Sequence, residues 1–247
     1  MSSDSSFITS IVLAQTYLYR FGGPILVFVG TLSCILSLIV FTRKNLRKNP
    51  CCIYLVTFNV ANFLLVYITL LSATLLLGYG ISPISYNMAL CRLNVYLALL
   101  LDGLSPSYLI LASIDRVLIT SPNARTRRRS THRLAYMCII GVTLFWILFH
   151  CYALLAANIV QLTPNYSTCY IESGIYLTFI GYYTLIVKAS ILPLLMAILG
   201  LWTIKNVRSF RGTTVIPIIS ITGSTAVGSN SAHAKDRQFV RILLIDI

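Results

Sequence analysis

Acidic residues are scarce in this chain of 247 residues, which contains 6 Asp and Glu against 19 Lys and Arg. Charged residues make up 10% of the chain and hydrophobic residues 57%, whereas ordinary soluble proteins carry about 25% charged residues. A soluble fold of this length would lack the polar residues that its surface needs. The sequence also lacks a Cys/His cluster with metal-ligand spacing, a nucleophile motif and a phosphate-binding loop. We therefore expect no enzyme, no metal and no cofactor.

The hydrophobic residues fall in long blocks that are almost free of charge. A helix of roughly 20 apolar residues crosses the hydrocarbon core of a membrane. Such blocks cover residues 23–41, 53–77, 93–114, 134–160 and 174–204, and the only charges inside them are Asp102 and Lys188. The sequence therefore predicts an all-α membrane protein with five transmembrane helices.

Basic residues lie almost entirely on one side of these blocks. Positive charge marks the cytoplasmic loops of membrane proteins. Arg20 and Arg92 alone fall on the other side, whereas the segments after the first, third and fifth blocks hold Arg43, Lys44, Arg47, Lys48, Arg116, Arg125, Arg127, Arg128, Arg129, Arg133, Lys205, Arg208, Arg211, Lys235, Arg237 and Arg241. This asymmetry predicts an extracellular N-terminus, residues 1–22, and a cytoplasmic loop over residues 205–238.

The basic run "RTRRRS" raises the alternative of nucleic-acid binding. Basic patches do attract phosphate backbones. Here, however, the charge alternates with membrane spans and falls on one face, so we expect no nucleic-acid partner and instead attraction to anionic membrane lipid.

The predicted extracellular side carries two further marks. Asn165, in Asn-Tyr-Ser, is an N-glycosylation acceptor in the loop between the fourth and fifth blocks. Cys91 and Cys169 are the only cysteines on this oxidising side. We predict that they form a disulfide, which would join the third helix to that loop.

Cys91 and Arg116 lie at opposite ends of the third block, about 37 Å apart if the block is one helix. With Asp115-Arg116-Val117, Cys169, Trp146 and Pro193, this spacing resembles the rhodopsin-like G-protein-coupled receptors, from about residue 22 onwards. The phrases "FTRKNLRKNPCCIYL" and "SIDRVLITSPNARTRRRS" are similar to invertebrate orphan receptors of the peptide-receptor type.

The resemblance implies a seven-helix receptor in the plasma membrane that binds an extracellular ligand, most simply a peptide, and activates a heterotrimeric G protein. Asp115 and Arg116 would form the G-protein switch, in which Asp115 neutralises Arg116 until the bundle opens. The competing interpretation is a plain ion pair at the membrane interface. Asn62, Trp146 and Pro193 match helix motifs of the family, although Asn62 replaces its usual Asp.

The end of the chain departs from the family pattern. Residues 239–247, "FVRILLIDI", resemble the start of a sixth helix. The Trp-Pro and Asn-Pro-Tyr motifs of the family's last two helices do not occur. We therefore expect the chain to be truncated in helix six.

Asp102 and Lys188 remain as charges inside the membrane, where such residues are rare and face the bundle interior. They form an ion pair or contact ligand, or else Lys188 snorkels along lipid while Asp102 is protonated. Intramembrane charge also leaves a transporter or channel subunit as the alternative function. Transporters typically show inverted repeats or broken helices, and neither is evident in this sequence.

Overall fold

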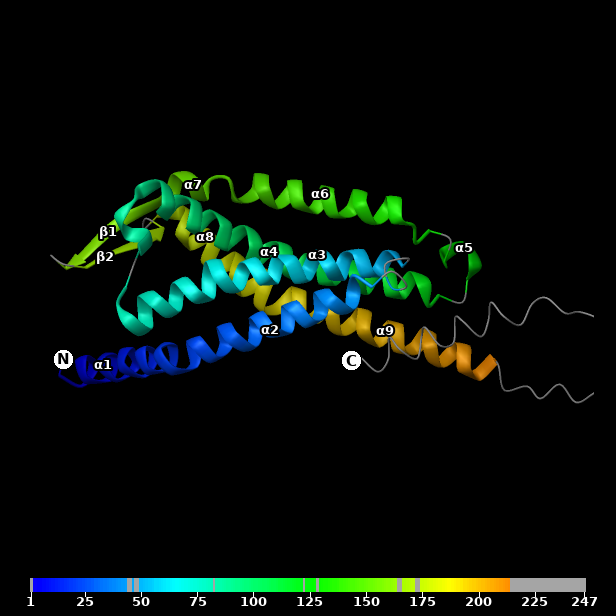
Figure 1. Cartoon of the computed structure of the whole chain (residues 1–247), viewed down its shortest axis with the longest axis horizontal. Helices are drawn as coiled ribbons and strands as arrows, with labels where there is room; N and C mark the ends of the chain where they lie inside the picture. Colours follow the sequence, from blue (N-terminus) through cyan, green and yellow to red (C-terminus); the bar gives the residue numbers. More distant parts are fainter. Residues whose placement is uncertain are drawn as a thin grey trace, which may run out of the picture. The chain divides into compact units, whose positions relative to one another are not determined.

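The computed structural model describes residues 2–43, 46, 49–81, 83–121, 123–127, 129–163, 166–171 and 174–213. Within these residues, five helices are long and apolar enough to cross a membrane (Figure 1). They are Thr9–Phe41, Pro50–Gly78, Met88–Ile119, His132–Ala156 and Ile175–Arg208. The predicted all-α, multi-pass membrane protein with five spans is confirmed. The predicted start of a sixth helix, residues 239–247, lies outside the described residues.

The first two spans are built from helices with short π-helical segments between them, and the third is a single helix. The first contains α1 (Ser2–Tyr17), the π-helical η1 (Leu18–Gly22) and α2 (Gly23–Phe41), and the second contains α3 (Pro50–Leu65) with the π-helical η3 (Val66–Leu71) and η4 (Thr74–Gly78). A 3-10 turn, η5 (Pro83–Tyr86), precedes α4 (Met88–Ile119), which forms the third span. Asn87 begins α4, because its side chain accepts a hydrogen bond from the backbone N–H of Ala89 at 2.9 Å.

The second half of the chain contains two spans and a hairpin. The short α5 (Ala124–Arg127) leads to α6 (His132–His150) and α7 (Ala153–Ala156), followed by strands β1 (Ala157–Thr163) and β2 (Tyr166–Ile171). The fifth span consists of α8 (Ile175–Tyr183), the π-helical η6 (Thr184–Ile191) and α9 (Leu192–Thr213). The two strands pair antiparallel, with Ala157 opposite Ile171.

Three helix limits differ from the limits of the predicted segments. The segment 1–22 is helical from Ser2 and continuous with the first span. The fourth span ends at Ala156, because the residues from Ala157 onward pair as a strand instead of continuing the helix. The start of the predicted loop 205–238 is also helical, since α9 continues to Thr213. Hydropathy locates what crosses a membrane, and it does not tell where a helix continues beyond it.

Two of the π-helical segments end one residue before a proline. Pro24 is the second residue of α2, after η1, and Pro193 is the second residue of α9, after η6. Proline has no N–H to donate, and its ring clashes with the carbonyl four residues earlier. The preceding turn is relieved when it widens to the π form. Lys188 lies in the widened turn of the fifth span.

The buried residues join α3, α4 and α6. One cluster lies midway along these helices, and a second lies nearer the end at Asp115. The buried members of the first are Ala61, Leu100, Leu101, Leu104, Tyr108 and Trp146. Those of the second are Cys51, Tyr54, Leu55, Ala112 and Ala135. Side-chain hydrogen bonds tie the same helices together: Ser105 to Asn62 at 2.7 Å, Trp146 to Ser107 at 2.9 Å, and Tyr108 with Thr143 at 2.8 Å.

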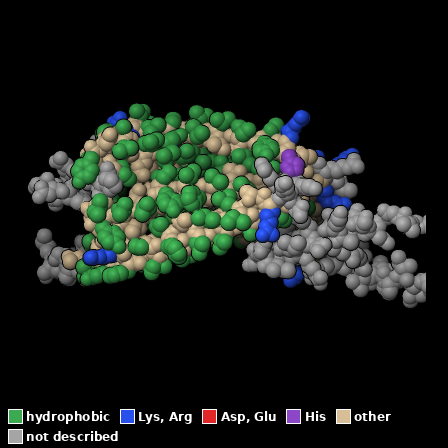
Figure 2. All heavy atoms as spheres, in the orientation of Figure 1, with side chains coloured by type: hydrophobic (Ala, Val, Ile, Leu, Met, Phe, Trp, Pro, Cys, Tyr) green, Lys and Arg blue, Asp and Glu red, His purple; other side chains and the backbone are tan. Residues whose placement is uncertain are grey.

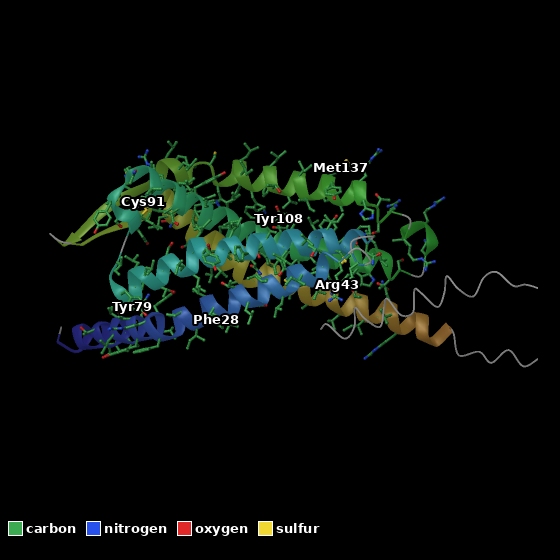
Figure 3. The ribbon with its side chains drawn as sticks, in the orientation of Figure 1. Phe28, Arg43, Tyr79, Cys91, Tyr108 and Met137 are labelled. Carbon is green, nitrogen blue, oxygen red and sulfur yellow. A yellow bond between two sulfur atoms is a disulfide. The ribbon has the colours of Figure 1, made fainter. Side chains whose placement is uncertain are left out.

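Hydrophobic side chains also cover the outside of the spans. Figure 2 shows them across the middle of the visible face, with Lys and Arg gathered towards its two ends. Phe28 and Met137 point outward and are 69% and 59% exposed, whereas Tyr108 lies between the helices and is 4% exposed (Figure 3). This is the surface that a lipid-embedded helix bundle requires, because only apolar side chains tolerate contact with the hydrocarbon.

Gly103 provides a test of this packing. A Cβ on Gly103 of α4 would lie 3.0 Å from Cδ2 and Cε3 of the buried Trp146 indole in α6. Overpacking of this kind costs about 1–3 kcal/mol, so we expect Gly103→Ala to lower the thermal unfolding midpoint in detergent. Gly141, which lies in α6 like Trp146, is the matched control because a Cβ there meets no atom within 4 Å. Equal midpoints for Gly103→Ala and Gly141→Ala would contradict the α4–α6 packing.

Candidate functional site

Asp115 lies near the end of α4 with its side chain buried, at 5% exposure. The hydroxyl of Ser130, in the segment between α5 and α6, donates a hydrogen bond of 2.6 Å to its Oδ1. The other carboxylate oxygen, Oδ2, is buried and has no hydrogen-bond partner. A single hydroxyl therefore gives this carboxylate its one hydrogen bond among the described residues, and the nearby His132 acts on it through its charge.

Arg116 follows directly but faces elsewhere. Its Nε is buried without a hydrogen-bond partner, and the guanidinium lies near the thiols of Cys51 and Cys52 at the start of α3. Among the described residues, no ion pair joins Asp115 to Arg116. The expected neutralisation of Arg116 by Asp115 is therefore not seen as an ion pair among the described residues, and the roles of the two residues stay a prediction.

The geometry of a helix explains this difference. Neighbouring residues on an α-helix do not face each other, whereas residues three or four positions apart do. Asp115 consequently points to Ser130, and Arg116 points to α3. Asp115 is buried, whereas a plain interfacial ion pair would place both charges within reach of water.

The two intramembrane charges meet. The ammonium of Lys188 in η6 donates to Oδ2 of Asp102 in α4 and forms an ion pair that links the fifth span to the third. The Lys188 nitrogen also lies 5.4 Å from the centre of the Tyr183 ring, a cation–π distance. The alternative in which Lys188 snorkels along lipid is therefore wrong.

A cavity of about 380 Å³ adjoins this pair. Its polar lining comes from Asp102, Lys188 and the hydrogen-bonded Asn62 and Ser105, and its apolar lining includes Pro193. The cavity therefore offers a carboxylate, an ammonium, an amide and a hydroxyl within apolar walls. Such a set orients a ligand by a few polar contacts, in the manner of many binding sites.

An aromatic cluster stands beside the ion pair. Trp146, Phe149 and His150 of α6 contact Phe179 and Tyr183 of the fifth span, with ring centroids between 5.0 and 6.5 Å apart. His150 is fully buried, and neither of its ring nitrogens has a hydrogen-bond partner. Trp146 thus belongs to the contact between the fourth and fifth spans.

The predicted disulfide is present at the other end of α4. Cys91 and Cys169 are bonded, with their Cα atoms 5.6 Å apart, so that β2 is joined to the beginning of α4. Figure 3 shows Cys91 beside the hairpin. The side chain of Arg92 adds a second link, because its Nε donates to the carbonyl of Ala157 at 3.3 Å. The glycosylation acceptor Asn165 lies outside the described residues.

Sequence reasoning missed Ser130 and Tyr183. Ser130 is fifteen residues from Asp115 along the chain, and Tyr183 lies in a uniformly apolar helix. No sequence pattern marks Tyr183. Ser130 could have been noticed only by its position, directly after the arginine run and before the Thr131 cap of α6.

No protein-family model matches this chain, and no curated protein matches it.

Proposed function

We propose that this chain is a rhodopsin-like G-protein-coupled receptor at the plasma membrane, with an extracellular N-terminus, an extracellular peptide ligand and a heterotrimeric G protein as its partner. The observation that carries the proposal is the organisation of α4. One end of this helix holds the disulfide to the β1–β2 hairpin, and the other end holds Asp115 and Arg116 beside the basic segment. The hairpin supports a peptide ligand, because edge strands accept extended peptides.

Arg116 is the residue that we propose for contact with the G protein. Its Nε has no partner in the structure, so a conformation that opens this end of the bundle would present an available donor. A hydrogen bond from a charged group contributes about 1.5–3 kcal/mol, which corresponds to roughly tenfold or more in coupling.

The test expresses the full open reading frame that contains this chain in eukaryotic cells and measures nucleotide exchange on purified heterotrimeric G proteins. We expect exchange above that of empty membranes. Arg116→Ala is expected to lower it about tenfold at an unchanged surface level, because the substitution strands no ion-pair partner. Arg125→Ala, an exposed arginine of the same basic segment, is the matched control. Equal exchange in wild type and Arg116→Ala would remove the proposed role.

A transporter or channel subunit is the second candidate, and the Asp102–Lys188 pair beside its cavity is the observation that favours it. Charged pairs at membrane depth commonly mark substrate or ion pathways. Uptake or ion flux in the same membranes, with no nucleotide exchange on any G protein, would decide for this alternative.

A further inference from the structure

We infer that Ser130 is a phosphorylation site for a protein kinase that selects basic substrates, and that phosphate on this residue opens the end of the bundle where Asp115 lies. The inference rests on the proposed function in one respect: that function places this segment on the cytoplasmic side of the membrane, where a kinase can reach it. It joins three observations: the bond from Ser130 to Asp115, the burial of Asp115 and the arginines that precede Ser130.

The first observation is the hydrogen bond itself. Ser130 is a partly buried residue outside any helix, and its hydroxyl donates to Asp115 Oδ1 at 2.6 Å. Among the described residues, this hydroxyl is the one hydrogen-bond partner of the Asp115 carboxylate, whose Oδ2 has none, and His132 acts on the carboxylate through its charge alone. The contact therefore depends on the one proton that a kinase would remove.

The second observation is the chemical character of the segment. Arg125, Arg127, Arg128 and Arg129 precede Ser130, without an acidic residue from Ser121 to Ser130. Kinases distinguish substrates by complementary charge patterns around the acceptor, so an acidic kinase groove fits this segment. Thr131 follows at once, but its side chain caps α6 by accepting from the N–H of Leu134 at 3.3 Å. Ser130 is consequently the better acceptor.

The reaction is a phosphoryl transfer from ATP, which the kinase supplies. A bond forms between Ser130 Oγ and the γ-phosphorus, and the bond from that phosphorus to the bridging oxygen breaks, with its electron pair leaving on ADP. The hydroxyl proton passes to the catalytic carboxylate of the kinase. The product carries about −1.5 to −2 charges at neutral pH.

Phosphorylated Ser130 has no proton to donate at Oγ, and its charge repels Asp115. The phosphate has better partners close by, because guanidinium groups bind phosphate in bidentate fashion and the N-terminus of α6 favours negative charge. Asp115 then loses the one hydrogen bond that the described residues give it, and only the nearby His132 is left to face the buried carboxylate. The end of α4 has to separate from α6 so that water reaches this carboxylate.

Cys51 reports such an opening. It is 2% exposed, its Sγ lies 3.8 Å from the carbonyl of Ala112, and it shares a buried cluster with Ala112 of α4 and Ala135 of α6. Ala112 is one turn from Asp115. Separation of α4 from α6 would therefore expose Cys51, whereas the already exposed Cys151 would be unchanged.

The experiment uses the full chain in sealed microsomes, whose cytoplasmic face is outward, with a purified kinase specific for basic substrates and ATP. We expect phosphate on Ser130, located by peptide mass mapping, and none in Ser130→Ala. Thr131→Asn, which keeps a capping side chain, should be labelled normally.

Asp115→Ala should be labelled about tenfold faster, because the bond to a charged group no longer holds the hydroxyl. After phosphorylation, N-ethylmaleimide should modify Cys51 about tenfold faster, with Cys151 unchanged.

Three results would overturn the inference. Absence of label from Ser130 in both wild type and Asp115→Ala would exclude the site. Labelling without faster modification of Cys51 would exclude the opening. Labelling that requires detergent would place the segment inside the microsome. None of these measurements involves a G protein, so a failure of the proposed receptor function remains distinguishable.

Discussion

Removing the disulfide is expected to destabilise the protein by about 4.5 kcal/mol, the value for a cross-link that closes a loop of this length. Cys91 and Cys169 are separated by 78 residues, and their bond restricts the unfolded chain across the third and fourth spans. The change is Cys91→Ala with Cys169→Ala, because a serine at the fully buried position 91 would add an unsatisfied hydroxyl. Thermal unfolding in detergent and surface expression in eukaryotic cells measure the effect.

A matched control is available in the same molecule. Cys151 is free and exposed, so Cys151→Ala should unfold at the temperature of the wild type. Either single substitution should destabilise about as much as both together, since each breaks the same bond. An unchanged midpoint in the double variant would mean that the bond contributes nothing to stability.

Breaking the Asp102–Lys188 pair is expected to cost about 2.5–3.5 kcal/mol for either single substitution, Asp102→Leu or Lys188→Met, which is the cost of a lone charge at membrane depth. Each leaves the partner charge within the membrane-spanning bundle without its counter-ion. Together the two substitutions should cost far less than the sum, because no unpaired charge then remains at membrane depth. The double-mutant cycle, measured by thermal unfolding in detergent, isolates the pair.

Lys205→Met is the matched control for this cycle. Lys205 lies in the same span but is exposed, and exposed substitutions of this kind usually change stability by less than about 0.5 kcal/mol. Exchange of the two charges, Asp102→Lys with Lys188→Asp, should recover part of the loss. Additive effects of Asp102→Leu and Lys188→Met would show that the two side chains are energetically independent.

The two residues also bear on the competing functions. The pair connects the third and fifth spans beside the 380 Å³ cavity. A ligand that contacts either charge would therefore weaken their mutual attraction and alter how these spans pack. The stability measurement and a signalling or flux measurement on the same variants would together tell whether the pair is structural or responds to ligand.

Much of the fold follows from the sequence, because crossing a membrane is a local property. Each block of apolar residues identifies its own helix, since each must satisfy its backbone internally in the hydrocarbon. All five spans were located this way. The Cys91–Cys169 bond was also predictable, once the charge pattern had left these two cysteines alone on the oxidising side.

Side-chain pairing was decided by the tertiary structure alone. Asp102 and Lys188 are 86 residues apart, and whether they meet depends on the depth and rotation of two separate helices. Hydropathy contains neither quantity. Lys188 lies in the π-helical segment before Pro193, which changes the rotation of the fifth span at this position. A regular α-helix built from the sequence would therefore have given Lys188 a different direction.

The two ends of α4 show the same division. The sequence alone determined that this helix carries Cys91 at one end and Asp115 with Arg116 at the other. The tertiary structure decided that the chain after α7 returns as a hairpin to Cys91, and that Ser130 rather than Arg116 partners Asp115. Adjacent residues on a helix face different neighbours, and which neighbour stands on each side is known only when the other helices are in place.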